Sequence, residues 1–182
     1  MLFDNANENI SLPDIPALHI DNNGIVSVSA WIYMVSGAGS GQYSLILGDW
    51  YAGPAFYIVR QSTTTTWDVR YWTTGTNKTL TTFTAQLSTW YHLVWVKNGM
   101  SLKFYLNGVL KNTVTDSVYS TRNPTNVVLG GSGSDNLYGR LDEVGLWNRA
   151  LSDNEVLTLY NNGNALSYCK NCNFGISIDV IN

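Results

Sequence analysis

Large aromatic side chains beside short polar ones form the part of the sequence best suited to binding a ligand. Trp50 and Tyr51 stand between Gly48 and Gly53, in a turn that separates two predicted strands and has little core to fill. Exposed aromatic rings can stack on the flat C–H faces of sugar rings, while nearby polar groups bond to the hydroxyls. Packing of these aromatics within the loops is the alternative. The predicted ligand-binding set is Trp50, Tyr51, Trp72, Asp49 and Arg70, and a wider set adds Thr66, Trp67, Asp68 and Tyr71.

Two aspartates could hold a metal ion. Asp142 opens a predicted strand in which Val144 and Leu146 face the core, and a carboxylate on that face needs a partner because an unpaired buried charge is costly. Asp4, in the first predicted turn, could join Asp142 if the terminal strands lie side by side. Because Ca²⁺ is bound by carboxylate and carbonyl oxygens, we predict one structural Ca²⁺ at Asp4 and Asp142. The alternative is that Asp142 accepts backbone N–H bonds and stabilises a loop.

Residue patterns for catalysis are weak. Asp142 and Glu143 are adjacent in a late predicted strand, so they are expected to face opposite sides of a sheet and cannot converge on one bond. The sequence has no Gly-x-Ser-x-Gly, His-Glu-x-x-His or phosphate-binding glycine-rich pattern. Cys169 and Cys172 form a Cys-x-x-Cys pair, for which an exposed thiol pair or a local disulfide is favoured over a redox or metal role. We therefore expect a binding protein and not an enzyme.

Composition and charge narrow the class of protein. The chain has 182 residues, a formal net charge of −3 and 13% charged residues, which favours one domain and disfavours nucleic-acid binding. No apolar run reaches the roughly 18 residues of a membrane span, so no membrane insertion is expected. The first residues lack the charged and apolar regions of a signal peptide. We expect an extracellular, virion or cell-surface location, reached after removal of a leader or without one.

Short strand patterns separated by turns recur along the chain and are typical of an all-β fold. Asn98-Gly99 and Asn107-Gly108 predict two hairpins with type I′ turns, because such turns need positive φ at both central positions. A further turn is expected at Gly75–Lys78. The predicted strands are Ile25–Met34, Tyr43–Leu47, Phe56–Arg60, Thr66–Trp72, Trp90–Val96, Leu102–Leu106, Val127–Leu129 and Leu141–Trp147.

One short helix follows the last of these strands. Ser152 and Glu155 have the spacing of a capping box, and Asn162-Gly163 supplies a stop. Many strands and a single helix predict a two-sheet antiparallel β-sandwich (jelly roll) with one short C-terminal helix. Within it, buried packing is the expected role of the strand tryptophans Trp31, Trp90, Trp95 and Trp147.

Four segments, in order, resemble the laminin-G-like jelly-roll family of the concanavalin-A-like lectin/glucanase superfamily. They cover most of the chain from Phe3 to about Gly163. The most specific is the last, which resembles the family's closing strand and the start of the helix. The segments are Phe3–Leu12, Val26–Ile32, Trp90–Val96 with Leu102–Gly108, and Gly139–Ser152.

The resemblance implies two face-to-face sheets and a ligand met at a loop rim or on a concave face. Many relatives bind glycans, extracellular proteins or lipidic ligands, often with one Ca²⁺. Relatives that cleave glucans carry a strand pattern similar to Glu-x-Asp-x-x-Glu, and this chain offers only the adjacent Asp142 and Glu143. The departure from the family's Asp-Gly turn is Asp4-Asn5, where Asn also tolerates a left-handed backbone.

Two functions from different classes follow. The first is a non-catalytic lectin-like recognition or adhesion module, domain 1–166, that binds carbohydrate at a loop rim. The alternative is a structural or decoration protein of a virion or surface fibre that acts through protein–protein contacts. In segment 167–182, Phe174–Ile181 alternates apolar and polar residues, so it could add a strand to another subunit and make a homo-oligomer, or pair within its own sheet. A glycoside hydrolase or lyase is the least favoured function.

Overall fold

The computed structural model describes ten stretches of the chain in which the sandwich is built. They are residues 2–3, 8–12, 24–35, 43–49, 53–60, 65–73, 76–116, 127–132, 135–166 and 176–177. Side chains are not described at 127, 131–132 and 135–136. Only the backbone is described at 43–49, 53–55, 60 and 176–177. The loops that would carry Trp50 and Tyr51, the turn at Asp4, and both cysteines lie outside the described residues.

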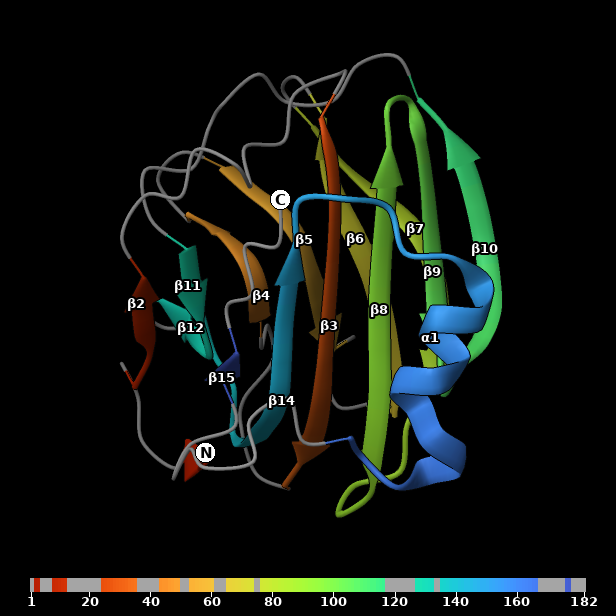
Figure 1. Ribbon diagram of the computed structural model, residues 1–182. Coiled ribbons are helices and arrows are strands. Elements are labelled where there is room, and N and C mark those ends of the chain that lie inside the picture. The colour runs from red at the N-terminus through yellow and green to blue at the C-terminus, as the bar shows by residue number, and fades with distance from the viewer. Residues whose placement is uncertain are drawn as a thin grey trace.

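Two sheets lie face to face, as predicted, and their described strands pair antiparallel except for the parallel pair of β14 and β15 (Figure 1). The larger sheet has the order β1-β14-β3-β8-β9-β10, with β15 also beside β14, and the smaller has the order β4-β5-β6-β7. The larger sheet comprises β1 (Leu2–Phe3), β3 (Ile25–Met34), β8 (Trp90–Asn98), β9 (Ser101–Leu106), β10 (Val109–Thr115), β14 (Gly139–Trp147) and β15 (Ile176–Ser177). The smaller comprises β4 (Tyr43–Asp49), β5 (Gly53–Arg60), β6 (Thr66–Thr73) and β7 (Thr76–Thr84).

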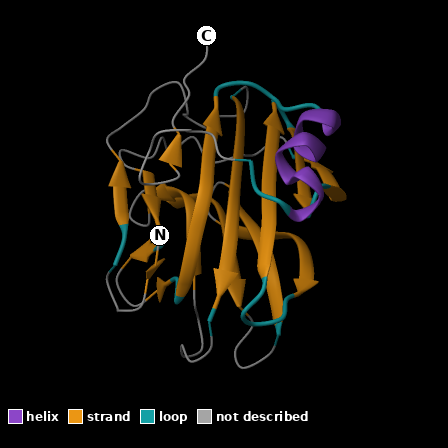
Figure 2. Ribbon diagram, turned by 60° about the horizontal axis from the view of Figure 1, so that its bottom comes forward, coloured by secondary structure: helices purple, strands orange, loops and turns teal. Residues whose placement is uncertain are grey.

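Two short strand pairs and one helix complete the described structure. Strand β2 (Ile10–Leu12) pairs with β11 (Val127–Leu129), and β12 (Gly131–Ser132) pairs with β13 (Asp135–Asn136). Helix α1 (Asp153–Tyr160) is followed by a 3-10 turn at Asn161–Gly163, and it lies against the outer face of the larger sheet (Figure 2). Among the described residues, no helix is long and apolar enough to cross a membrane.

The core lies between the sheets and is built by side chains that alternate along the strands. In β3 the alternate residues from Val26 to Ile32 are fully buried, and in β6 Trp67, Val69 and Tyr71 are buried in the same cluster. The strand predicted at Thr66–Trp72 therefore alternates between the core and the outer face. This alternation also removes Trp67 and Tyr71 from the wider ligand-binding set, because their rings fill the core. Burial of each such side chain contributes roughly 1.5–3 kcal/mol.

The hairpins of the larger sheet agree with the predicted ones except in one register. Asn107 and Gly108 have φ of 52° and 75°, the pair of positive values that a type I′ turn needs. In the other hairpin Asn98 already pairs with Ser101, so the turn residues are Gly99 and Met100 and the predicted Asn98-Gly99 turn is wrong by one position. Gly99 has φ of 57°, and a glycine at the first central position is typical of a type II′ turn.

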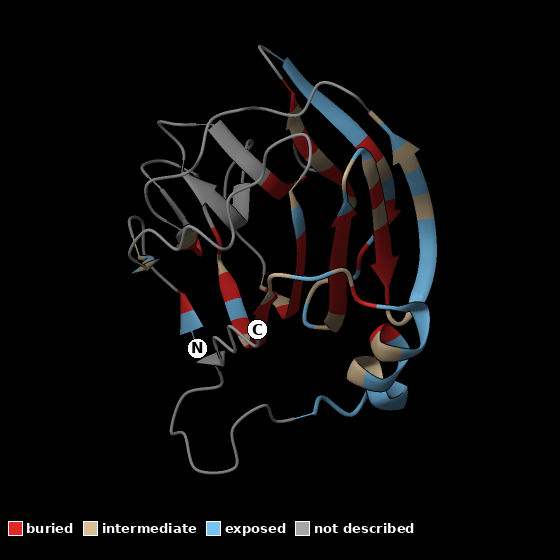
Figure 3. Cartoon of the chain, turned by 45° about the horizontal axis from the view of Figure 1, so that its top comes forward, coloured by how far each residue is buried: buried red, intermediate tan, exposed pale blue. Residues whose placement is uncertain are grey.

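The expected turn at Gly75–Lys78 is also shorter than predicted. Strand β7 begins at Thr76, which pairs with Thr73, and runs to Thr84. Its residues are rich in threonine and largely exposed, as Figure 3 shows for the outer edge of the molecule. Lacking an apolar alternation over its first half, the segment carried little strand signal.

Helix α1 is fixed to the outer face of the larger sheet by a second apolar cluster. This cluster contains Val94, Val96, Tyr105, Leu151 and Val156. The predicted capping box is present, with Ser152 accepting a bond from the Glu155 backbone and Glu155 reaching back to Ser152. As a consequence, β3 and β8 are buried on both faces over much of their length.

Both edges of the larger sheet are protected. Strands β1 and β15 both pair with β14, and the β15 register sets Ile176 beside Val144 of the same chain. At the other edge, β10 has a bulge between Leu110 and Asn112, and the Asn112 side chain donates a hydrogen bond to the Leu80 carbonyl of β7 at 2.5 Å. The described part of the C-terminal segment thus pairs within its own sheet, which was the alternative to an intersubunit strand.

Candidate ligand-binding pocket

A bulge in β14 sets the position of the predicted metal carboxylate. Asp142 pairs with Trp31 of β3, but the next partners along the two strands are Gly145 and Ser29, so β14 holds one residue more than β3 between these pairs. Glu143 lies in this bulge with φ of 45°, in the left-handed region that few non-glycine residues occupy. A bulge of this kind redirects the side chains on either side of it.

The bulge turns Asp142 away from the core. Leu141, Val144 and Leu146 are all buried in the core between the sheets, although Leu141 and Val144 are three positions apart. Asp142, between them in the sequence, lies on the outer face. The prediction that Asp142 shares the core face with Val144 and Leu146 is therefore wrong, because simple alternation fails across the bulge.

Trp31 and His92 are opposite each other in the next two strands and form the floor of this region. Their ring centroids are 5.1 Å apart, and the His92 Nε2 atom lies 2.8 Å from the Ser29 hydroxyl. Burial lowers the pKa of His92 to about 4, so its imidazole is neutral at physiological pH. Both Ser29 and His92 are fully buried. This pair resembles a nucleophile and base in type, but no substrate can reach it.

Tyr160, the last residue of α1, packs against Trp31 in the floor of this region. Its ring is stacked on Trp31 at 5.8 Å with an interplanar angle of 16°. After it, Asn161, Asn162 and Gly163 all have positive φ, of 46°, 54° and 89°. Because consecutive left-handed residues reverse the chain sharply, the segment turns back over the outer face of the sheet.

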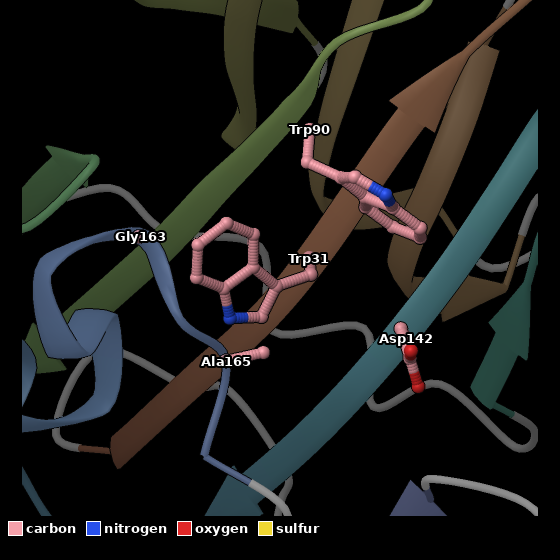
Figure 4. A pocket seen from close by; sticks show the side chains of 5 residues that line it. All are labelled: Trp31, Trp90, Asp142, Gly163 and Ala165. Carbon is pink, nitrogen blue, oxygen red and sulfur yellow. The ribbon is translucent and has the colours of Figure 1, made fainter.

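The result is a pocket of about 180 Å³ (Figure 4). It is lined by Trp31, Trp90, Asp142, Gly163 and Ala165. In the close-up the two indole rings and the carboxylate come from three neighbouring strands and lie around a shared opening, with Ala165 beside the Trp31 ring. The volume is below the roughly 300 Å³ typical of pockets for drug-sized ligands, so it suits one sugar ring.

Among the described lining residues, three side chains carry polar atoms, Trp31, Trp90 and Asp142. Trp31 is 4% exposed, and its Nε1 atom has no hydrogen-bond partner among the described residues. The Asp142 carboxylate accepts a bond from the backbone N–H of Glu143 at 3.0 Å, which orients it. A carboxylate has about four acceptor positions, so capacity remains for a ligand hydroxyl. Because the Trp31 N–H is buried from solvent, its lack of a partner is a cost to stability, and Asp142 is left as the side-chain acceptor that a ligand can reach.

An aromatic row continues from the pocket along the outer face. Tyr33 pairs with Trp90 of β8 on one side and with Arg140 of β14 on the other. The rings of Tyr33 and Trp90 are 5.3 Å apart, and the Arg140 guanidinium carbon lies 5.4 Å from the centroid of the Tyr33 ring. All three side chains lie outside the cover of helix α1 and reach solvent to some degree.

The predicted ligand-binding residues lie elsewhere in the fold. In β6, Arg70 and Trp72 alternate with the core residues, which places them on the outer face of the smaller sheet, and both are half-buried. Arg70 is paired there with Asp68 at 2.6 Å. Asp142 lies on the outer face of the opposite sheet. The structure therefore does not bring the predicted ligand set and the predicted metal residue into one site.

Other predicted residues lie outside the described part or lack described side chains. Trp50, Tyr51 and Asp4 are outside it, and Asp49 ends β4 with only its backbone described. Among the described residues, no group of three or more histidine, cysteine, aspartate or glutamate side chains could hold a metal ion. Asp142 alone is one carboxylate, so the Ca²⁺ site at Asp4 and Asp142 stays a prediction.

The two tryptophans of the pocket were expected only as packing residues. Buried packing is confirmed for Trp31 and for Trp95 of the core, whereas Trp90 is half-buried and lines the pocket. Trp31 is buried, but on the outer face. The sequence holds a signal for this, since alternation along Ile25–Met34 sets Trp31 and Tyr33 opposite Val26, Val28, Ala30 and Ile32.

Comparison with known proteins agrees with this architecture. A family model described as the concanavalin A-like lectin/glucanases superfamily matches residues 4–157. No curated protein sequence matches the chain. Among solved structures, a heptameric SAP-like pentraxin from Limulus polyphemus is 18% identical with a TM-score of 0.57, and the match covers 85% of this chain and 82% of the pentraxin.

Two further structures are similar at low identity. Domain 4 of AbnA, an extracellular arabinanase from Geobacillus stearothermophilus solved with arabinotriose, is 21% identical with a TM-score of 0.59, covering 84% of this chain and 72% of that one. The binding domain of botulinum neurotoxin serotype G is 13% identical with a TM-score of 0.68; the match covers 87% of this chain and 41% of the neurotoxin domain. Identities this low establish the fold alone. With two face-to-face sheets and a family match over most of its length, the chain belongs to the concanavalin A-like lectin/glucanases superfamily.

Proposed function

We propose that this protein is a non-catalytic, lectin-like recognition module that binds carbohydrate in the pocket formed by Trp31, Trp90 and Asp142. The observation that carries the proposal is the placement of two indole rings and one carboxylate around a single opening. Aromatic rings and a few convergent polar groups are the usual lining of a small-molecule site.

The polar groups suit a hydroxyl-rich ligand. A sugar hydroxyl can donate to Asp142, while the ring's C–H face packs on Trp90. The proposal thus uses the acceptor and the apolar surface of the pocket together.

Similar structures support a binding role of this general kind. The arabinanase domain was solved with arabinotriose, and a botulinum neurotoxin DC binding domain with a similar fold was solved with a ligand named SialylT. Another neurotoxin DC complex contains rat synaptotagmin II, which is a protein partner. An extracellular or cell-surface location follows as part of the proposal, because carbohydrate ligands are presented there.

A second location for the sugar remains open on the smaller sheet. The sequence favours a rim that includes Trp50, Tyr51, Asp49, Arg70 and Trp72. The Arg70–Asp68 ion pair shows that polar groups are already organised on that face. Substitution of one tryptophan in each location distinguishes the two.

The experiment is a glycan array probed with wild-type protein and with the variants Trp90→Ala and Trp72→Ala. We expect Trp90→Ala to weaken binding about 5- to 10-fold, because an aromatic contact contributes about 1 kcal/mol beyond its area and 1.4 kcal/mol is tenfold in Kd. Trp72→Ala should bind as wild type does. Loss of binding in Trp72→Ala alone would move the site to the smaller sheet, and no binding by the wild type would refute the proposal.

Addition of a chelator to the same array tests the predicted Ca²⁺. If one structural Ca²⁺ is bound at Asp4 and Asp142, chelation should lower glycan binding, and Asp142→Asn should bind equally weakly with and without chelator. Unchanged binding in chelator, together with weaker binding of Asp142→Asn, would assign Asp142 to the sugar and not to a metal.

The alternative function is a structural component of a larger assembly. Both edges of the larger sheet are protected within the chain, which disfavours assembly by strand addition at those edges. Size-exclusion chromatography of the full chain and of residues 1–166 provides the test. A concentration-dependent oligomer lost on truncation would favour the assembly function.

A further inference from the structure

Arg140 lies beside the pocket, with its guanidinium over the ring of Tyr33. Among the arginines with described side chains, it is the one that forms no ion pair. Its side chain is on an exposed residue of β14, and its guanidinium carbon is 5.4 Å from the Tyr33 ring centroid. None of the ion pairs among the described residues involves it, whereas Arg70 and Arg149 are each paired with a carboxylate. An arginine held on an aromatic face keeps its planar fork of N–H donors free for a ligand.

Arg140 and Asp142 lie on the same outer face of β14 with one residue between them. Their backbones are therefore about 7 Å apart, given about 3.3 Å per residue along a strand. Tyr33 lies between Arg140 and Trp90, and its ring is 5.3 Å from the Trp90 ring. The aromatic surface thus continues from the pocket to the guanidinium without leaving the outer face.

The negative charge of Asp142 and the positive charge of Arg140 give the two ends of this surface opposite preferences for a charged ligand. Asp142 lines the pocket, so a carboxylate entering the pocket would meet a like charge. Arg140, one sugar unit away, offers two parallel N–H donors that match a planar carboxylate. The net charge of −3 opposes this only weakly, because charges separated by more than about 8 Å are screened at physiological salt.

We infer that Tyr33 and Arg140 form a second subsite, which takes the carboxylate of an acidic sugar adjoining the one in the pocket. The inference rests on the proposed carbohydrate function and specifies its ligand class: a glycan with a neutral sugar in the Trp31–Trp90–Asp142 pocket and a carboxylate-bearing sugar next to it. Arg140 selects among glycans by charge, and Tyr33 positions Arg140.

The test is an array of glycans printed in matched pairs, in which each acidic glycan (hexuronate-containing or sialylated) stands beside its carboxyl-reduced form. Within a pair the skeleton is unchanged and only the charge is removed. We expect the wild type to prefer the acidic member roughly 3- to 10-fold, with a preference that declines as salt is raised. Arg140→Gln should abolish the preference and bind the reduced member as the wild type does.

Two further variants complete the design. Lys111→Gln removes the same charge from exposed strand β10, at the far edge of the sheet, and should leave the preference unchanged. Arg140→Lys keeps the charge but loses the fork, and should retain only part of the preference. Equal binding of both members of every pair by the wild type, or equal effects of Arg140→Gln and Lys111→Gln, would overturn the inference. Those outcomes differ from failure of the proposed function, in which no member of any pair binds.

Discussion

Acidification should destabilise this protein through one buried histidine. His92 is fully buried beneath the pocket, between Trp31 and the ring of Tyr160, whose centroid lies 6.1 Å away. Its Nε2 atom faces the Ser29 hydroxyl, and Nδ1 has no partner among the described residues. With no carboxylate among these neighbours, a proton on the ring would be a buried and uncompensated charge.

The size of the effect follows from the pKa of His92, which burial lowers from 6.5 to about 4. Because the unfolded chain keeps the higher pKa, it binds more protons than the folded protein between these two values. The contribution to the free energy of unfolding is therefore fully present above about pH 6.5 and is lost as the pH falls toward 4. At about 1.4 kcal/mol per pH unit, the complete loss is about 3 kcal/mol.

Urea unfolding followed by tryptophan fluorescence measures this directly. Between pH 7.5 and 5 we expect the wild type to lose about 2 kcal/mol more than His92→Gln, which cannot titrate. This pH window lies above the range in which protonation of Glu155 changes the free energy of unfolding. The hydrogen bond from Arg149, with further bonds from Ser152, lowers the pKa of Glu155 to about 2, so its contribution is lost only below about pH 4.5.

The comparison of pH dependence, and not of absolute stability, removes the effect of the substitution itself. Ser29→Ala serves as the control, because it deletes the hydrogen bond but leaves the imidazole to titrate. We expect Ser29→Ala to keep most of the pH dependence. The reasoning fails if His92→Gln and wild type lose the same free energy over this interval.

Two further substitutions test how the pocket is supported. Ser27→Ala should lower the free energy of unfolding by about 2 kcal/mol and the Tm by roughly 4–8 °C. The reason is that the buried Ser27 hydroxyl donates to the Arg149 carbonyl at 2.7 Å and accepts from the Leu151 N–H at 3.0 Å. A shift in Tm below about 1 °C in calorimetry would contradict this. Gly139→Ala should lower the free energy of unfolding by about 1–3 kcal/mol and weaken glycan binding, because the added Cβ would overlap the backbone oxygen of Tyr33. Chemical unfolding measures the first effect and the glycan array the second. Wild-type values in both measurements would exclude the overlap.

The strands and the helix could be predicted because their signals are local. The β3 span Ile25–Met34 and the β11 span Val127–Leu129 are as predicted, since alternation and flanking turn residues fix a strand without reference to its neighbours. The capping box at Ser152 is likewise a contact within four residues. Turn register is less certain, because Gly99 alone suits either of two hairpin turns that differ by one residue.

The pocket proposed to bind a ligand could not be predicted because its parts meet only through pairing between distant strands. Trp31, Trp90 and Asp142 are far apart in sequence, and register alone puts them side by side. Tryptophan in a strand is usually a packing residue, so its type gave no indication of a half-open position. The helix stop at Asn162-Gly163 was predicted, but the packing of the following chain against Trp31, which forms the pocket wall, depends on tertiary contacts that no local pattern specifies.

A single extra residue in β14 decides whether Asp142 and Arg140 lie on the outer face or face the core. Without the bulge at Glu143, strict alternation from Val144 and Leu146 would direct Asp142 into the core, where its charge would be unpaired, and would turn Arg140 inward with it. With the bulge, both side chains join the aromatic row of Trp31, Tyr33 and Trp90. Because Glu143 occupies a left-handed backbone conformation there, the arrangement carries a conformational cost that other contacts must offset. The proposed binding function accounts for a strained backbone beside a carboxylate and an arginine outside any ion pair, which stability alone does not.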